Sequence, residues 1–229
     1  MIKVSRTTKI HNPIKGYKNK YVPKGHVTQF FGENVELYMA AIGTNGHTGI
    51  DIVAPHGTPM YAVEGGIVCD VKEDPSGYGK HLRILTQSGD KIEREWTYGH
   101  NSANYVKIGD VVKAGQYIAD MGNTGFVVSS FDKNAHGFWD RGGNNYAGTH
   151  LHLGLREFIY DKRGWRYNDK TPRITTLNYE NGFKGSLDFE ELFQDGVNGD
   201  FEILKRELEK SGEEDWYMKL IRGLRFFGH

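Results

Sequence analysis

The 229-residue sequence lacks the features that mark several common classes of protein. Its single cysteine, Cys69, excludes both an intramolecular disulfide framework and a cysteine-based zinc site. Lysine plus arginine and aspartate plus glutamate each number 29, so bulk charge gives no argument for nucleic-acid binding. No run approaches the roughly 18 apolar residues of a transmembrane helix, and no membrane insertion is expected.

The first 25 residues also lack the apolar core of a secretory signal peptide. They are basic and polar and contain Pro13 and Pro23. We expect them to form an N-terminal extension, either an extended leader or a peripheral strand. Regular patterning begins at His26.

Glycine and tyrosine are abundant, with 30 and 13 residues, which favours a turn-rich β protein over a helical bundle. From Ile50 to about Ile159, short β-type segments alternate with glycine-containing turns. Strands at this density without intervening helices predict an antiparallel sheet or sandwich. The clearest expected strands are Ile50–Val53, Met60–Val63, Ile67–Val71, His81–Thr86, Glu93–Tyr98, Tyr117–Met121 and His150–Phe158.

Two regions depart from this pattern. Phe126–Gly148 is long, irregular and rich in aromatic residues, so it is either an ordered flap near the following strand or a self-packed surface loop. Near the C-terminus, Asp200–Leu208 and Glu214–Phe227 predict two short amphipathic helices. The expected organisation is an extension over 1–25, a β domain over 26–162, and a C-terminal extension over 163–229.

Two short segments about a hundred residues apart bring together residue types that bind metals. In Gly46–Asp51, glycines flank His47 and β-branched residues follow Asp51, which predicts a loop running into a strand with Asp51 turned away from the core. In Thr149–Leu153, alternation places His150 and His152 on one face of a strand.

Together these segments offer three imidazoles and one carboxylate, a donor set suited to zinc. A catalytic zinc typically has three protein ligands and one open position. The spacing alone leaves open which of His150 and His152 is a ligand. His100, at the end of Trp96–His100, is a further candidate for the site.

These motifs occur in an order that resembles the lysostaphin-type zinc endopeptidases of peptidoglycan. The resemblance covers roughly residues 26–160 and rests on the combination, since each motif alone is weak. The series is Gly46-His47-Thr48-Gly49-Ile50-Asp51-Ile52, Ala54-Pro55-His56-Gly57-Thr58-Pro59-Met60-Tyr61-Ala62, Tyr98-Gly99-His100, Gly115-Gln116, Gly122-Asn123-Thr124-Gly125 and Thr149-His150-Leu151-His152.

The resemblance implies an antiparallel β-sheet core with an open groove and one Zn2+ per chain. It assigns His47, Asp51 and His152 as zinc ligands. His100 and His150 are then a catalytic pair beside the metal. We further expect Tyr98 to line the groove and contact substrate.

The implied function is hydrolysis of peptide stems or cross-bridges of bacterial peptidoglycan by a metal-activated water. A non-catalytic relative that binds peptidoglycan or activates a hydrolase is the alternative; relatives of that kind have lost ligands, whereas this ligand set is complete. A zinc peptidase that acts on soluble protein is a third possibility.

The sequence departs from the family pattern at Asn101, where leucine is common, in its long segment before His150, and in its tail beyond about Asp161. The substrate places the site of action in the wall, the periplasm or the extracellular space. Because no signal peptide is visible, we expect a phage lysin, a virion-associated enzyme or an unrecognised export route.

Overall fold

The computed structural model describes residues 10–14, 26–75, 77–87, 92–128, 136–138, 146, 148–160, 174–189 and 192. The predicted C-terminal helices lie outside these residues, as does most of 129–147, so both remain predictions. Within the described part of the chain, no helix has the length and apolar character needed to cross a membrane.

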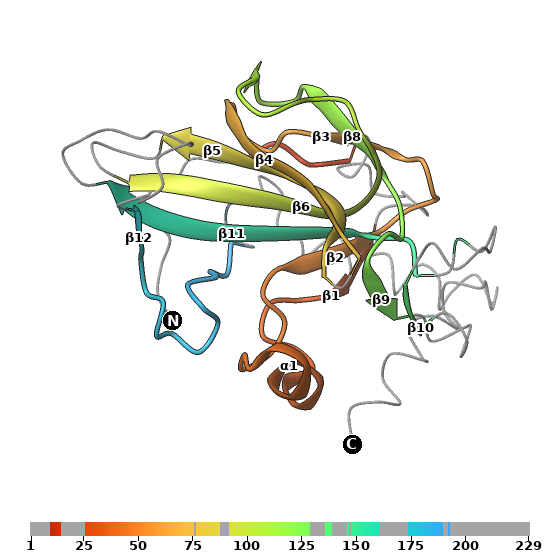
Figure 1. Cartoon of the computed structure of the whole chain (residues 1–229), viewed down its shortest axis with the longest axis vertical. Helices are drawn as coiled ribbons and strands as arrows, with labels where there is room; N and C mark the ends of the chain where they lie inside the picture. Colours follow the sequence, from red (N-terminus) through yellow and green to blue (C-terminus); the bar gives the residue numbers. More distant parts are fainter. Residues whose placement is uncertain are drawn as a thin grey trace, which may run out of the picture.

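A large antiparallel sheet dominates the fold and confirms the predicted class (Figure 1). Its strands follow the order β1-β2-β11-β6-β5-β4-β7, while β12 pairs with β11, and β8 pairs with β3 and β6. A separate two-stranded sheet joins β9 to β10. The bounds are β1 His26–Gln29, β2 Ile50–Val53, β3 Pro59–Tyr61, β4 Gly66–Asp74, β5 Gly79–Gln87, β6 Ile92–Asn104, β7 Val111–Val112, β8 Tyr117–Met121, β9 Phe126–Val128, β10 His136–Phe138, β11 Leu151–Tyr160 and β12 Ile174–Thr176.

One helix, α1 at Val35–Ile42, precedes the predicted run of strands and was not anticipated from the sequence. Good helix formers such as Glu36, Leu37 and Met39 make up this segment. The helix ends at Gly43, whose φ of 69° lets its own N–H reach the Met39 carbonyl and the Thr44 N–H reach the Tyr38 carbonyl. None of the α1 residues is buried, so the helix carries no apolar face that packs into the core.

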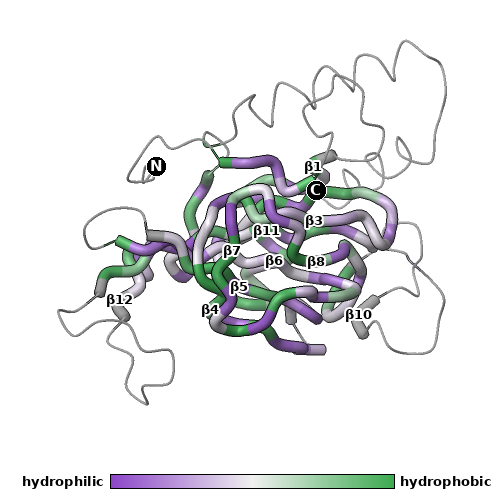
Figure 2. Tube along the Cα trace, turned by 90° about the horizontal axis from the view of Figure 1, so that it is seen from above, coloured by the Kyte–Doolittle hydropathy of each residue, from purple (hydrophilic) through white to green (hydrophobic). Residues whose placement is uncertain are grey.

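The two faces of the sheet have different roles. In β11, Leu151, Leu153 and Leu155 are buried in the main hydrophobic core, while His152 and Gly154 turn to the other face. The short strands β3 and β8 cover the core face, and α1 lies on the opposite side of the sheet (Figure 1). Figure 2 shows hydrophobic and hydrophilic stretches mixed along the described chain.

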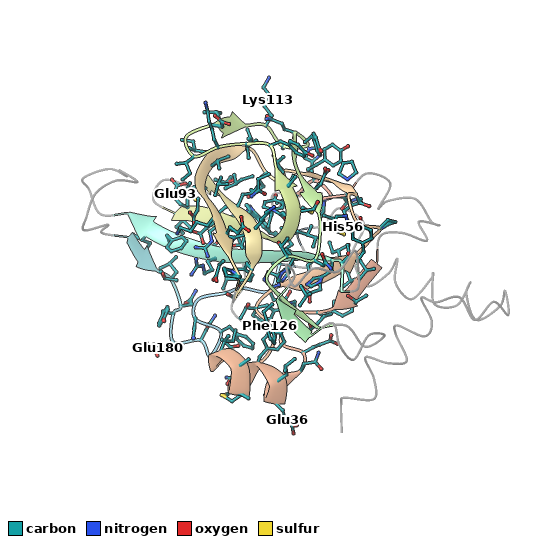
Figure 3. The ribbon with its side chains drawn as sticks, turned by 45° about the vertical axis from the view of Figure 1, so that its right-hand side comes forward. Glu36, His56, Glu93, Lys113, Phe126 and Glu180 are labelled. Carbon is teal, nitrogen blue, oxygen red and sulfur yellow. The ribbon has the colours of Figure 1, made fainter. Side chains whose placement is uncertain are left out.

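Residues from both predicted extensions contribute to this core. Ile10 and Ile14 are 0% and 3% exposed, and Ile14 forms a β-bridge with Met60. The Ile10 N–H donates to the Leu192 carbonyl, and the Phe189 ring meets Trp96 edge-on at 5.1 Å. Farther out, Glu36 and Glu180 lie on the α1 side of the sheet and Lys113 on the other (Figure 3).

Candidate metal centre and active site

The loop before β2 places His47 on the face of the sheet opposite the main hydrophobic core. Gly46 has a φ of 132°, and a Cβ there would lie 2.2 Å from the Gly32 carbonyl oxygen, so only glycine fits. The His47 N–H donates to the Glu33 carbonyl, and the Gly32 N–H donates to the His47 carbonyl. These bonds hold the loop as predicted, with His47 ahead of the strand and Asp51 inside it.

Strand register brings the second histidine segment beside the first. His152 of β11 is paired with Asp51 of β2 on one side and with Gly99 of β6 on the other. The next row, Ile50, Leu153 and Tyr98, faces the core. The alternation predicted for both segments is therefore confirmed. A Cβ at Gly99 would lie 3.1 Å from Tyr78 Cδ1, so the missing side chain leaves room for the Tyr78 ring beside His152.

Three donor atoms converge at this point. His47 Nε2 lies 2.9 Å from His152 Nδ1, and each of these nitrogens lies 3.1 Å from Asp51 Oδ1. The three residues are buried, and they form a group whose ligand atoms could hold one ion. Zinc–nitrogen and zinc–oxygen bonds are about 2.0–2.2 Å, so atoms this close together can share one ion.

The remaining two predicted histidines lie beside this group. His150 Nε2 is 3.7 Å from Asp51 Oδ2, and the His150 and His100 rings are 4.5 Å apart between centroids. The His100 ring is 6.2 Å from that of His152. The structure thus brings together all five histidine and aspartate positions that the sequence singled out.

His100 reaches the site through a β-bulge. Between the pairs Lys80↔Asn101 and Leu82↔Tyr98, β6 has two residues where β5 has one. His100 occupies the left-handed region with a φ of 64°, which non-glycine residues rarely adopt outside constrained sites. The Tyr78 carbonyl accepts its N–H at 2.7 Å, which helps to fix this conformation.

Backbone carbonyls orient three of the imidazoles. His100 Nδ1 lies 2.8 Å from the Thr124 oxygen, His150 Nδ1 lies 2.7 Å from the Gly148 oxygen, and His47 Nδ1 lies 3.3 Å from the Phe30 oxygen. Because a carbonyl oxygen only accepts, each Nδ1 carries the proton. The Nε2 atoms of these rings therefore keep their lone pairs, available for a metal or a proton.

Electrostatics favour a deprotonated donor set. Burial alone raises the pKa of Asp51, but the neighbouring His47 and His150 and the hydrogen bond from His152 hold that pKa well below its usual range. Burial lowers the pKa of His152, and burial plus the neighbouring His150 and His152 rings lowers that of His100 well below the ordinary value. Asp51 is thus charged and these two imidazoles are neutral at neutral pH, as metal ligands and proton acceptors must be.

Tyr98 requires a correction. Its side chain is fully buried on the core face, where its hydroxyl oxygen accepts the Val63 N–H at 2.8 Å. The ring therefore does not line the open face of the sheet, and the predicted substrate contact was wrong. The bulge explains the error, because an extra residue between Tyr98 and Asn101 ends the simple alternation of faces.

Two other tyrosines flank the site and were missed. The Tyr38 ring of α1 lies 5.2 Å from His47, and its hydroxyl donates to Gln29 Oε1 at 3.2 Å. The Tyr78 ring lies 4.9 Å from His152 and 6.3 Å from His100. Tyr38 stands nine residues before His47 on a helix that the sequence pattern did not reveal, and Tyr78 lies in a glycine turn.

Comparison with known proteins agrees with this geometry. Residues 45–166 match peptidase family M23, and the chain belongs to that family.

Among its relatives, the uncharacterized lipoprotein YgeR of Escherichia coli K12 is 44% identical over 93 residues, covering 41% of this chain and 35% of that protein. The glycyl-glycine endopeptidase ALE-1 of Staphylococcus capitis is 37% identical over 92 residues, covering 40% of this chain and 25% of that protein. The murein hydrolase activator NlpD of Escherichia coli K12 is 36% identical over 94 residues, covering 41% of this chain and 23% of that protein. The matched region spans about a third or less of each of these relatives.

A solved structure is also similar to this chain. The catalytic domain of the prophage-encoded M23 protein EnpA from Enterococcus faecalis, solved as a point mutant, shares 27% identity. The match covers 70% of this chain and 92% of that one, with a TM-score of 0.42.

Proposed function

We propose that this chain is a zinc-dependent endopeptidase that hydrolyses peptide stems or cross-bridges of bacterial peptidoglycan. The observation that carries the proposal is the convergence of His47 Nε2, Asp51 Oδ1 and His152 Nδ1 within 3.1 Å of one another, with two more imidazoles beside them. Membership of a peptidase family and a relative named as a glycyl-glycine endopeptidase support it.

In this proposal His47, Asp51 and His152 hold one Zn2+ through the three converging atoms. The donor set fits zinc, because it combines two neutral imidazoles with one ionised carboxylate and contains no thiolate. When bound, zinc acidifies a coordinated water and polarises the peptide carbonyl. The low pKa of Asp51 keeps its charge available to the metal at neutral pH.

His100 and His150 are the proposed catalytic pair. With Nδ1 held as a donor by the Thr124 and Gly148 carbonyls, each Nε2 can accept a proton from the attacking water. Once protonated, the same nitrogen can donate to the developing oxyanion or to the leaving amine. Two imidazoles 4.5 Å apart can divide these tasks, one as base and the other as oxyanion donor.

A second candidate function is that of a non-catalytic activator, supported by the similarity to a protein named as a murein hydrolase activator. Both candidates act on the wall, and therefore outside the cytoplasmic membrane. The endopeptidase is favoured because every donor that the reaction needs is present, from the three ligands to the two bases. Release by a phage or presence on a virion remains a prediction from the sequence.

Purified protein tests the proposal directly. We expect about one zinc per chain, loss of turbidity in a suspension of purified walls, abolition of that lysis by a chelator, and recovery on adding zinc back. Asp51→Ala should lose both zinc and lysis. A protein that binds zinc but leaves walls intact while accelerating an added amidase would be an activator, and hydrolysis of soluble protein without wall lysis would indicate a different substrate.

A further inference from the structure

A cluster of tyrosines lies on the outer surface of the β3–β8 layer and includes none of the residues of the candidate metal centre. Tyr105, just after β6, is 55% exposed, and Tyr117 of β8 is 40% exposed. Their rings are 4.9 Å apart and inclined by 36°. The Tyr61 ring of β3, which is paired with Tyr117 across the two strands, lies 6.0 Å from it.

One carboxylate fixes the two most exposed rings of this cluster. Asp120 Oδ2 accepts the Tyr105 hydroxyl and Asp120 Oδ1 accepts the Tyr117 hydroxyl, each at 2.6 Å. Hydrogen bonds to a charged acceptor are the strong class, so the rings are held in place before any ligand arrives. Pre-ordering of this kind lowers the entropic cost of binding.

The chemistry of the cluster indicates what can bind it. Both hydroxyls are already engaged by Asp120, so the cluster offers flat ring faces more than free polar groups. The carboxylate is occupied by two donors, which disfavours a ligand that binds mainly through charge. Flat rings with satisfied hydroxyls suit an uncharged ligand that has apolar faces, and the pyranose rings of a sugar chain have such faces.

The chain leads from this cluster toward the candidate metal centre. From Asp120 the chain runs through Met121 to Gly122, whose carbonyl accepts the His150 N–H at 3.1 Å. Beside this path the rings of His56 and Tyr146 stack at 4.1 Å, and Tyr146 is 60% exposed. The Tyr146 carbonyl accepts both the N–H and the hydroxyl of Thr149, next to His150.

We propose that Tyr105, Tyr117 and Tyr61, braced by Asp120, form a platform that binds a chain of N-acetylated amino sugars by stacking. This inference rests on the proposed function, because in peptidoglycan such a chain carries the peptides. Holding the glycan on β8 would bring its peptides toward the candidate metal centre beside His150. The platform is then a binding site for the carbohydrate part of the substrate, separate from the catalytic residues.

The experiment measures binding of short β-1,4-linked N-acetylglucosamine oligomers and of peptide-free glycan strands to the zinc-loaded full chain. The double variant Tyr105→Ala, Tyr117→Ala should bind at least about tenfold more weakly than the unaltered protein. Tyr179→Ala is the matched control, because Tyr179 is 52% exposed and lies after β12. Asp120→Asn, which keeps both rings, should give an intermediate loss, and it serves as the test if the double variant does not fold.

Activity separates this inference from the proposed function. The double variant should cleave intact walls more slowly than the unaltered protein but hydrolyse a glycan-free peptide substrate at the same rate. If the unaltered protein cleaves no peptide yet binds glycan through these tyrosines, the proposed function fails and the platform stands. Failure of the unaltered protein to bind glycan, equal loss in Tyr179→Ala, or a self-association that the double variant abolishes would overturn the platform.

Discussion

At the scale of single residues, His100 shows how backbone geometry prepares a side chain for chemistry. Its positive φ is uncommon for a non-glycine residue, and such strain persists only where surrounding contacts over-determine it. Here the contacts are the Tyr78 carbonyl on its N–H and the Thr124 carbonyl on Nδ1. The ring is held beside the proposed metal ligands without itself belonging to the group of converging donor atoms.

Substituting this histidine should separate metal binding from catalysis. We expect His100→Ala to keep about one zinc per chain and to lose about 10²–10⁴-fold in rate, the usual contribution of a positioned acid or base. His47→Ala, which removes one of three ligands, should lose both zinc and activity. Metal analysis of the two purified variants makes the comparison, and loss of zinc from His100→Ala would move His100 into the ligand set.

Thr124 offers a second residue-scale prediction. Its hydroxyl donates to the Asn101 carbonyl and accepts the Lys80 N–H, each at 2.8 Å, so it ties β5 to β6 at the bulge. Thr124→Val removes both of these buried hydrogen bonds and should lower the free energy of unfolding by about 1–3 kcal/mol. It should also slow turnover with zinc content unchanged, because the adjacent carbonyl orients His100.

Urea denaturation and steady-state kinetics measure the two effects. Thr86→Val is the control, because its hydroxyl donates to the Gly65 carbonyl at 3.0 Å in a different part of the sheet. A control that loses turnover as strongly as Thr124→Val would refute the positioning role.

At the scale of elements, close packing between β2 and β11 forms the site. A Cβ at Gly49 would lie 2.3 Å from the Leu153 carbonyl oxygen and 2.9 Å from His152 Cε1. The strand carrying Asp51 can approach the strand carrying His152 only because residue 49 has no side chain. Gly154 lies on the other flank of the same ring, where a Cβ would be 3.4 Å from His152 Nε2.

Substituting alanine at these two glycines should have opposite effects on zinc binding. Gly49→Ala must displace a backbone carbonyl and the His152 ring, so the variant should fail to bind zinc stoichiometrically. Gly154→Ala adds only an ordinary van der Waals contact and should retain the metal. Zinc analysis with circular dichroism on both proteins checks this, and a fully zinc-loaded Gly49→Ala would show that the loop adapts.

Elements also show where sequence reasoning succeeded and failed. The shared face of His150 and His152 and the change from loop to strand between His47 and Asp51 could be predicted from the sequence. The reason is that the alternation of side chains in a regular strand depends only on neighbouring residues. Tyr98 was misplaced because Gly99 was interpreted as the end of a strand, whereas it lies at a bulge within β6. Helix α1 was missed because it has no buried residue and therefore no amphipathic pattern facing the core. Spacing made His100 only a further candidate, and its expected role came from the family resemblance.

At the scale of the whole molecule, residues far apart in the sequence pack into the same hydrophobic core. Isolated residues of the predicted N-terminal extension, Ile10 and Ile14, are buried in it, as are Phe189 and Leu192 near the other end of the described chain. Isolated buried residues produce no periodic hydrophobic pattern, so their contacts with the core could not be predicted from the sequence. The domain boundaries at 26 and 162 remain predictions.

Because Ile10 is buried, truncating it should strongly lower the free energy of unfolding, although the sequence predicted only an N-terminal extension here. Ile10→Ala should lower the free energy of unfolding by about 2–5 kcal/mol, the range for truncating a buried aliphatic side chain. Ile42→Ala on α1, where Ile42 is 45% exposed, should change it by no more than about 0.5 kcal/mol. Urea denaturation compares them, and equal effects would mean that Ile10 does not pack in the core in solution.

The most direct test of the endopeptidase assignment is to incubate purified peptidoglycan with the zinc-loaded protein and to identify the products by mass spectrometry. We predict peptide fragments with one newly freed amino group and one newly freed carboxyl group per cut, absent with a chelator and absent with Asp51→Ala. Their masses also identify the bond that is cut. The endopeptidase assignment would be contradicted if a fully zinc-loaded protein left both kinds of wall chemically unchanged, those with glycine bridges and those with direct cross-links.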